Sequence, residues 1–133
     1  MKLHHTAFWT GDLERLENFY IKYFGGKVLF RHSINDFKCT FMEIAGSFKI
    51  EIMTRTDISG HAADERIGYS HLSIEVESRE KVNELTDFFM KENVKILKNR
   101  EQYDDGFYES SVCDPDGNII ELAYVDRTVN PHV

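Results

Sequence analysis

The order of secondary-structure patterns repeats along the 133-residue chain, and this repeat restricts the fold more than any other feature. Each half predicts a strand, a helix and three further strands. The halves share this order without close sequence identity, so the repeat is one of topology. The alternative is an ordinary α+β domain whose halves are similar by accident. The pattern favours an α+β fold made of two tandem βαβββ modules.

Helix signals occur at the same place in both halves. In the first half, Asp12 is placed to cap a helix that Gly25 ends. In the second half, Ser78 takes the capping position. The expected strands and helices are, in chain order, about 2–9, 11–26, 27–33, 37–45 and 48–54, then 70–77, 78–93, 94–101, 107–114 and 118–125.

The chain length suits one domain, residues 1–133, in which the two modules are joined by a short connection. We expect the first module at residues 1–55 and the second at residues 70–127. Residues 56–69 are polar and contain two glycines, as is typical of a linker.

Charge and composition exclude several classes of partner. The formal net charge of −7 repels nucleic acid and anionic membranes. No apolar run approaches the ~20 residues needed to span a membrane, and the N-terminus predicts a strand in place of a signal sequence. We therefore expect a cytoplasmic protein with a small-molecule substrate. Cys39 and Cys113 lack any metal-type spacing and are interpreted as reduced packing residues.

Four residues of metal-ligand type occupy equivalent places in the two halves. His5 and His71 fall in the first strand of each module, and Glu51 and Glu121 fall in the last. Two imidazole nitrogens and two carboxylate oxygens suit a divalent transition metal. A single His or Glu in a strand is more often a surface residue, so the matched placement carries the hypothesis.

Side-chain alternation favours the same hypothesis. In the strand at 48–54, Glu51 lies on the face opposite Ile50 and Ile52, and Glu121 lies opposite its apolar neighbours in the same way. The apolar faces are expected to pack under the helices. The faces that carry the acids are expected to line a partly polar concavity.

Several segments resemble the landmark segments of the vicinal oxygen chelate superfamily, which contains glyoxalases, bleomycin resistance proteins and dioxygenases. They are "MKLHHTAFWTGDLERLENFY", "FKIEIM", "GYSHLSIEV" and "DPDGNIIEL". Within this superfamily the chain is most similar to small glyoxalase I-like (lactoylglutathione lyase-like) proteins. The resemblance implies two βαβββ modules that form a curved, mostly antiparallel sheet around a metal cleft, usually in a homodimer.

The resemblance also implies a site and a reaction. His5, Glu51, His71 and Glu121 would bind one divalent ion per site, with Zn, Ni, Co, Mn and Fe(II) as candidates. The expected activity is that of a lyase or isomerase acting on a small α-oxygenated carbonyl compound, for example a hemithioacetal. The proton would move through a metal-stabilised enediolate, with Glu121 or Glu51 as the base.

Two residues depart from glyoxalases that use glutathione. Those enzymes typically have an arginine where this chain has Trp9 and an asparagine where it has Arg55. Trp9 provides an apolar wall, and Arg55 is suited to bind a carboxylate. These departures argue against glutathione as the cosubstrate. The candidate substrate-binding residues are Trp9, Met53, Arg55, Ser73 and Phe107.

Other activities within the same superfamily are alternatives. An acyl-thioester epimerase often has Gln at the position of Glu51. An extradiol dioxygenase holds iron(II) with three protein ligands, which would leave Glu51 superfluous. A non-catalytic resistance protein that binds a drug or metabolite would need only an aromatic-lined cleft.

Overall fold

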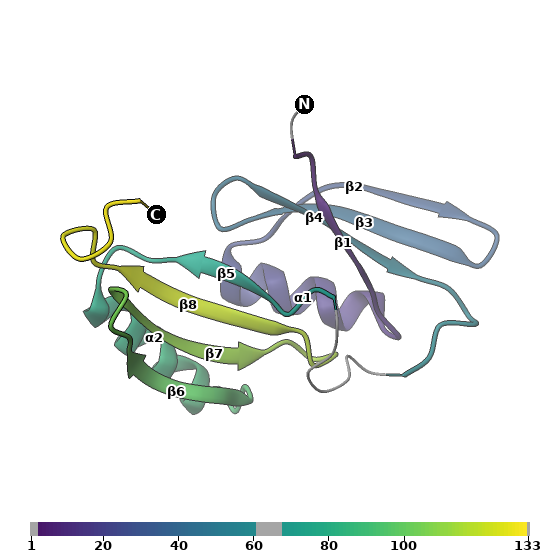
Figure 1. Cartoon of the computed structure of the whole chain (residues 1–133). Coiled ribbons are helices and arrows are strands. Elements are labelled where there is room, and N and C mark those ends of the chain that lie inside the picture. The colour runs from purple at the N-terminus through teal and green to yellow at the C-terminus, as the bar shows by residue number, and fades with distance from the viewer. Residues whose placement is uncertain (1–2, 61–67, 133) are drawn as a thin grey trace. The chain divides into compact units, whose positions relative to one another are not determined.

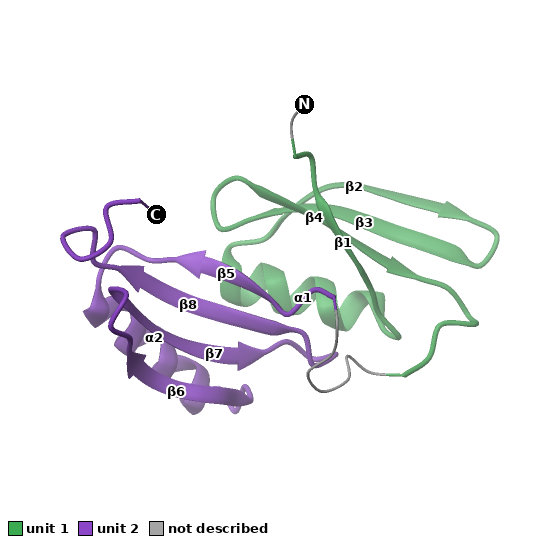
Figure 2. Ribbon diagram, in the orientation of Figure 1, with its two compact units in different colours: residues 1–61 green, residues 62–133 purple. Residues whose placement is uncertain are grey.

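The computed structural model describes residues 3–60 and 68–132, and the chain forms two compact units, Met1–His61 and Ala62–Val133 (Figure 2). Residues 61–67 of the expected linker 56–69 lie outside the described residues. No helix in the described part of the chain is long and apolar enough to cross a membrane.

The first unit contains one helix and one four-stranded sheet (Figure 1). The strand order is β1-β4-β3-β2, with β1 parallel to β4 and the other neighbours antiparallel. The first strand begins later than expected, so His5 lies directly before it. The elements are β1 (Thr6–Trp9), α1 (Leu13–Phe24), β2 (Lys27–Ile34), β3 (Phe37–Ile44) and β4 (Phe48–Thr54).

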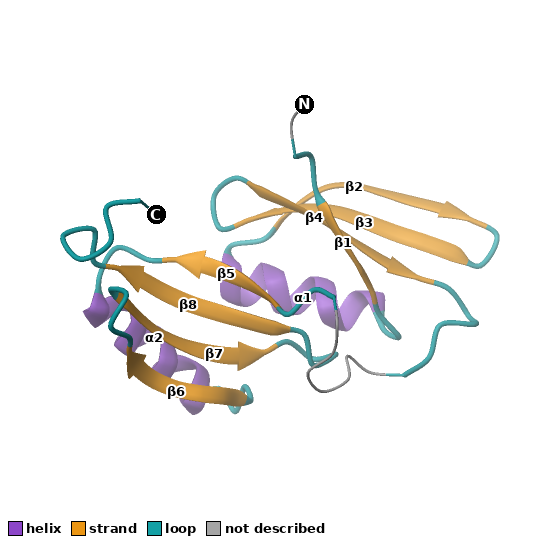
Figure 3. Ribbon diagram, viewed as in Figure 1, coloured by secondary structure: helices purple, strands orange, loops and turns teal. Residues whose placement is uncertain are grey.

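The second unit repeats this arrangement (Figure 3). Its strand order is β5-β8-β7-β6, with β5 parallel to β8 and antiparallel neighbours elsewhere. The prediction of an α+β fold with two βαβββ modules is therefore confirmed. The elements are β5 (His71–Glu75), α2 (Arg79–Lys91), β6 (Ile96–Gln102), β7 (Phe107–Cys113) and β8 (Ile119–Val125).

Local signals start and end the helices as the sequence predicts. The Asp12 side chain accepts a hydrogen bond from the Arg15 amide at 3.0 Å, which caps α1. Ser78 caps α2 in the same way. Gly25 ends α1 with a φ of 61°, and a Cβ on Gly26 would lie 2.8 Å from the carbonyl oxygen of Tyr20. The two glycines therefore allow the chain to leave α1 and turn directly into β2.

Each helix packs on the apolar face of its own sheet. In the first unit, Leu16 and Tyr20 of α1 are fully buried together with Ile50 and Ile52 of β4. In the second unit, the buried apolar set is Val82 and Phe89 of α2 with Ile120 and Leu122 of β8. This burial is the main stabilising contribution. It also turns Glu51 and Glu121 to the opposite face of each sheet, as alternation predicts.

Helix α1 is also tied to its sheet by a buried acid. Glu17 accepts a hydrogen bond from the Thr40 hydroxyl in β3 at 2.9 Å, and Arg31 in β2 donates to both oxygens of the same carboxylate. Burial acts to raise the pKa of Glu17, but the bonds from Arg31 and Thr40 outweigh it, so the pKa is lowered. The charged acid is tolerated because its oxygens are satisfied.

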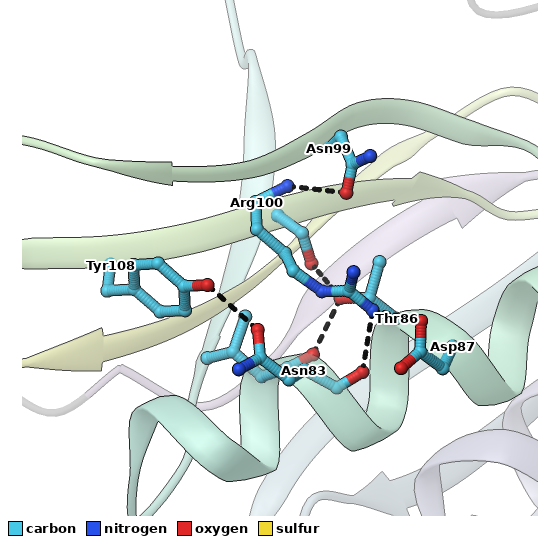
Figure 4. A network of polar contacts seen from close by, with 8 residues as sticks. Asn83, Thr86, Asp87, Asn99, Arg100 and Tyr108 are labelled. Carbon is cyan, nitrogen blue, oxygen red and sulfur yellow. Dashed lines mark hydrogen bonds and ion pairs between the residues drawn. The ribbon is translucent and has the colours of Figure 1, made fainter.

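Helix α2 is tied to its sheet by comparable contacts made with different residues (Figure 4). Arg100 in β6 donates to the backbone carbonyl of Asn83 at 3.0 Å and forms an ion pair with Asp87. The hydroxyls of Thr86 in α2 and Ser110 in β7 lie 2.7 Å apart, and both residues are fully buried. Each helix thus receives an arginine from the outer strand of its sheet and a hydroxyl from the strand beside it.

Replacing the buried acid tests its contribution to stability. Because the pKa of Glu17 is lowered, its contribution is present above the ordinary pKa of 4.5 and is lost as pH falls through the lowered value. Glu17→Gln should reduce the free energy of unfolding by about 1–3 kcal/mol at neutral pH, and by less in acid. Urea denaturation followed by circular dichroism measures this. The exposed control Glu14→Gln should change it by under about 0.5 kcal/mol; equal losses in both variants would contradict the assignment.

Candidate metal centre

The first module brings His5 and Glu51 together. His5 lies directly before β1, Glu51 lies in the middle of β4, and His5 Nε2 is 3.3 Å from Glu51 Oε2. The other ring nitrogen, Nδ1, is 2.8 Å from Nδ1 of His4. The His5 ring also packs against Phe41, with 4.9 Å between ring centroids. These contacts hold the imidazole with Nε2 directed toward the carboxylate.

The second module brings His71 and Glu121 together in the same manner. His71 is the first residue of β5, Glu121 lies in β8, and His71 Nε2 is 3.1 Å from Glu121 Oε2. His71 Nδ1 lies 3.1 Å from the hydroxyl of Ser70. Each imidazole therefore has Nδ1 bound to the side chain before it and Nε2 at the acid.

The strand register explains why the two pairs match. Ala7 pairs with Glu51 and Ser73 pairs with Glu121, so in both modules the residue two positions after the histidine is opposite the acid. Glu51 and Glu121 are similarly covered, with 16% and 17% of their side chains exposed. The equivalence predicted from the sequence is therefore present in the geometry of each module.

The donors of each pair suit a divalent transition metal. Each module offers one imidazole nitrogen and one carboxylate oxygen, and the second ring nitrogen is occupied by a neighbouring side chain, as is usual for metal-binding histidines. Neither module, over its described residues, gathers three His, Cys, Asp or Glu side chains by itself. Each module thus brings one nitrogen donor and one oxygen donor together.

The surroundings of the two pairs differ. We call the sheet face that carries Glu51 or Glu121 the ligand-bearing face of its module. In the first module this face is aromatic: Phe41 is opposite Glu51 and stacks on Phe30 with 4.6 Å between ring centroids. Trp9 and Phe37 form a second aromatic contact at 6.3 Å. These rings provide an apolar surface beside the acid.

The ligand-bearing face of the second module is polar. Ser73 and Ser111 are the cross-strand neighbours of Glu121 on its two sides. Lys98 pairs with Ser111 in the register of β6 and β7, and it forms an ion pair with Glu101 at 2.9 Å. The two modules therefore share a ligand geometry and differ in the chemistry around it.

The two positions that depart from glutathione-using glyoxalases contact each other. The Arg55 guanidinium lies over the Trp9 ring, 5.4 Å from its centroid, and pairs with Asp57. The hydrogen bond and charge of Asp57 raise the pKa of Arg55. A substrate carboxylate at Arg55 would have to compete with Asp57, which already binds Nε and Nη2 of the guanidinium. Of the other candidates for substrate binding, Met53 pairs with Trp9 in the sheet, and Phe107 begins β7 opposite Val125.

Two further residues lie beside the acids and are not among the site residues that the sequence predicts. Cys39 is opposite Met53, two residues beyond Glu51, and Glu109 is opposite Ala123, two residues beyond Glu121. They are thus equivalent positions in the two modules. Alternation along β7, with the register set by the turn at 114–117, would have placed Glu109 on the ligand-bearing face.

Cys39 and Glu109 interact differently with the neighbouring acids Glu51 and Glu121. Burial raises the pKa of the Cys39 thiol, and so do its hydrogen bond to Glu51 and the charge of that carboxylate. Burial and the charge of Glu121 raise the pKa of Glu109, although Lys98 and His71 oppose this. Glu51 is therefore beside a thiol donor, and Glu121 is beside a second carboxyl group.

A sequence profile identifies the family. The profile of the Glyoxalase/Bleomycin resistance protein/Dioxygenase superfamily matches residues 2–122, and the chain therefore belongs to this superfamily. The resemblance read from the sequence is confirmed. No curated protein sequence matches the chain.

Solved structures share the fold across nearly the whole chain. A glyoxylase/bleomycin resistance protein/dioxygenase domain from Frankia sp. EAN1pec has a TM-score of 0.82 at 17% identity, covering 95% of this chain and 93% of its own. A mutant of the Listeria monocytogenes fosfomycin resistance protein FosX, complexed with Mn(II) and 1S,2S-dihydroxypropylphosphonic acid, has a TM-score of 0.75 at 20% identity, with 96% and 95% covered. The trypanothione-dependent glyoxalase I of Leishmania major has a TM-score of 0.74 at 29% identity, with 93% and 86% covered.

The contact between Cys39 and Glu51 is testable by thiol labelling. In native protein both buried cysteines should react slowly with iodoacetamide because their pKa values are raised. Glu51→Gln removes a charge that raises the Cys39 pKa, so labelling of Cys39 should become several-fold faster. Peptide mapping by mass spectrometry reports each cysteine separately. Glu121→Gln is the matched control and should leave the Cys39 rate unchanged; equal acceleration in both variants would refute the contact.

Proposed function

We propose that the chain is a divalent-metal-dependent enzyme of the glyoxalase I type, a lyase or isomerase of a small α-oxygenated carbonyl compound. The observation that carries this proposal is the pair of equivalent His–Glu contacts, 3.3 Å in one module and 3.1 Å in the other. Membership of the superfamily and the likeness to glyoxalase I of Leishmania major support it.

Four residues would hold the metal: His5, Glu51, His71 and Glu121. We propose one ion per site, with ligands from both module types, taken from one chain or from two chains of a homodimer. A divalent cation supplies Lewis-acid stabilisation of the negative charge that develops on substrate oxygens. Zn, Ni, Co, Mn and Fe(II) all accept this donor set, and Mn(II) is the ion bound in the FosX relative.

The residues of the chain supply the proton transfer. Glu121 or Glu51 accepts a proton from the carbon beside the substrate carbonyl and returns it to the neighbouring carbon. Each acid is only 16–17% exposed, so little water competes for it. The bonds to His5 Nδ1 and His71 Nδ1 keep the imidazoles oriented while the acid moves.

The contacts of Arg55 favour a substrate other than a glutathione adduct. Glutathione carries carboxylates that need a free cation, whereas Arg55 is paired with Asp57 and lies over Trp9. The proposed substrate is therefore a small molecule, such as the hemithioacetal of a short thiol. Neither nucleic acid nor a membrane is proposed as a partner.

Metal analysis is the first test. Protein purified without an affinity tag should contain one equivalent of a divalent ion, measured by inductively coupled plasma mass spectrometry. His71→Ala removes one of four donors and should lower metal affinity by at least about tenfold. The control His132→Ala lies outside both pairs and should retain the metal. Metal-free wild-type protein would contradict the proposal and favour the alternative of a drug- or metabolite-binding protein.

Turnover tests the role of the two acids. Glu51→Gln and Glu121→Gln should each reduce isomerisation of methylglyoxal hemithioacetals by about 10²–10⁴-fold, because an amide can neither accept the proton nor supply the negative charge of a carboxylate ligand. Circular dichroism should show that both variants remain folded. Glu77→Gln is an exposed control that should keep full activity. Full activity in both acid variants, or oxygen uptake with catechols, would reject the proton-transfer mechanism.

A further inference from the structure

Glu109 in β7 is a half-buried acid on the ligand-bearing face of the second module. Among residues 3–60 and 68–132, its carboxylate makes neither a hydrogen bond nor an ion pair. Partly buried carboxylates are normally paired, because losing water without gaining a donor is unfavourable. An unpaired acid at this place therefore needs an explanation.

The register places Glu109 beside Glu121. Ser111 is opposite Glu121 and Glu109 is opposite Ala123, so the two acids are diagonal neighbours on one face of adjacent antiparallel strands. Such neighbours lie roughly 7–8 Å apart. A small molecule held at Glu121 would thus extend to Glu109 with a chain of only a few atoms.

The charged groups around Glu109 leave it unsatisfied. Glu121 and Asp105 repel its charge, while Lys98 and His71 attract it from a distance. Lys98 is already committed to an ion pair with Glu101. Burial raises the pKa of Glu109, because its carboxylate loses water without gaining a donor from the described part of the chain. A donor from outside the protein would supply the missing partner.

The position equivalent to Glu109 in the first module has a hydrogen-bond partner. There the equivalent position is Cys39, whose thiol donates to Glu51. That contact gives the Cys39 thiol a partner within the protein. At Glu109 the same position carries an acceptor that receives no hydrogen bond from the described part of the chain, so of these two equivalent positions the one in the second module can be completed by a ligand donor.

We propose that Glu109 is a specificity-determining residue that accepts a hydrogen bond from a donor group on the substrate, either a hydroxyl or an ammonium. This inference rests on the proposed function, because it places the reacting part of the substrate at Glu121. The substrate is then an α-oxygenated carbonyl compound with a hydrogen-bond donor a few atoms from its reacting carbons. A purely apolar substituent at that place would leave Glu109 buried and unpaired.

Binding of chelators with matched tails tests the inference without relying on turnover. Hydroxamic acids present two vicinal oxygens, and their tails can differ in the donor alone. To test an ammonium donor, 4-(dimethylamino)butanohydroxamic acid is compared with its apolar isostere, 5-methylhexanohydroxamic acid. To test a hydroxyl donor, 5-hydroxypentanohydroxamic acid is compared with its apolar isostere, hexanohydroxamic acid. Dissociation constants are measured by calorimetry on zinc-loaded protein.

The wild-type protein should bind at least one donor-tailed compound about tenfold more tightly than its apolar partner. Glu109→Leu should abolish or reverse that preference. Glu109→Gln keeps an acceptor oxygen but loses the charge, so it should retain a preference for the hydroxyl and lose one for the ammonium. The control Glu77→Gln removes an exposed carboxylate outside β7 and β8 and should leave every preference unchanged.

The outcomes separate the two proposals. Equal binding of donor and apolar tails by the wild-type protein overturns the inference about Glu109 and leaves the metal site standing. A preference that persists in Glu109→Leu also overturns it. Failure of the wild-type protein to take up zinc or another divalent ion overturns the proposed function and this inference together.

Discussion

The parallel pairing of the first and last strand in each module is the constraint on which the site depends. It sets Ala7 opposite Glu51 and Ser73 opposite Glu121. Each histidine lies two residues before the residue that pairs with its acid, and from there its ring contacts the carboxylate. Parallel neighbours need a crossover connection, and here the helix and the two intervening strands provide it. A slip of one residue in this register would turn the acid into the apolar core. The apolar face under each helix therefore also fixes the His–Glu contact.

The two modules reach the same architecture with different side chains. An arginine on the outer strand reaches the helix in both, yet Arg31 bonds to a buried carboxylate and Arg100 bonds to a backbone carbonyl and an aspartate. Sequence identity between the halves is therefore low although their topology is the same. The aromatic ligand-bearing face of the first module and the polar one of the second continue this divergence at the site.

Much of the fold and part of the candidate site could be predicted from the sequence. Caps such as Asp12 and the alternation around Glu51 and Glu121 are local signals, and they identified the modules and the four proposed ligands. The roles of Cys39 and Glu109 could not be predicted in this way. Alternation states which face a side chain occupies, whereas its neighbours depend on registers that include bulges, as between β2 and β3. The ion pair of Arg55 with Asp57 could likewise not be predicted from the sequence, since it depends on the conformation of the loop after β4.

The contacts described above that position each His–Glu pair come from within its own module. The paired strands, the neighbouring side chains at Nδ1 and the helix that covers the other face belong to one unit in each case. The geometry of a pair is therefore inherited with its module. Duplication, exchange between chains or reordering of modules in evolution would preserve both His–Glu pairs, while the surrounding faces could change independently.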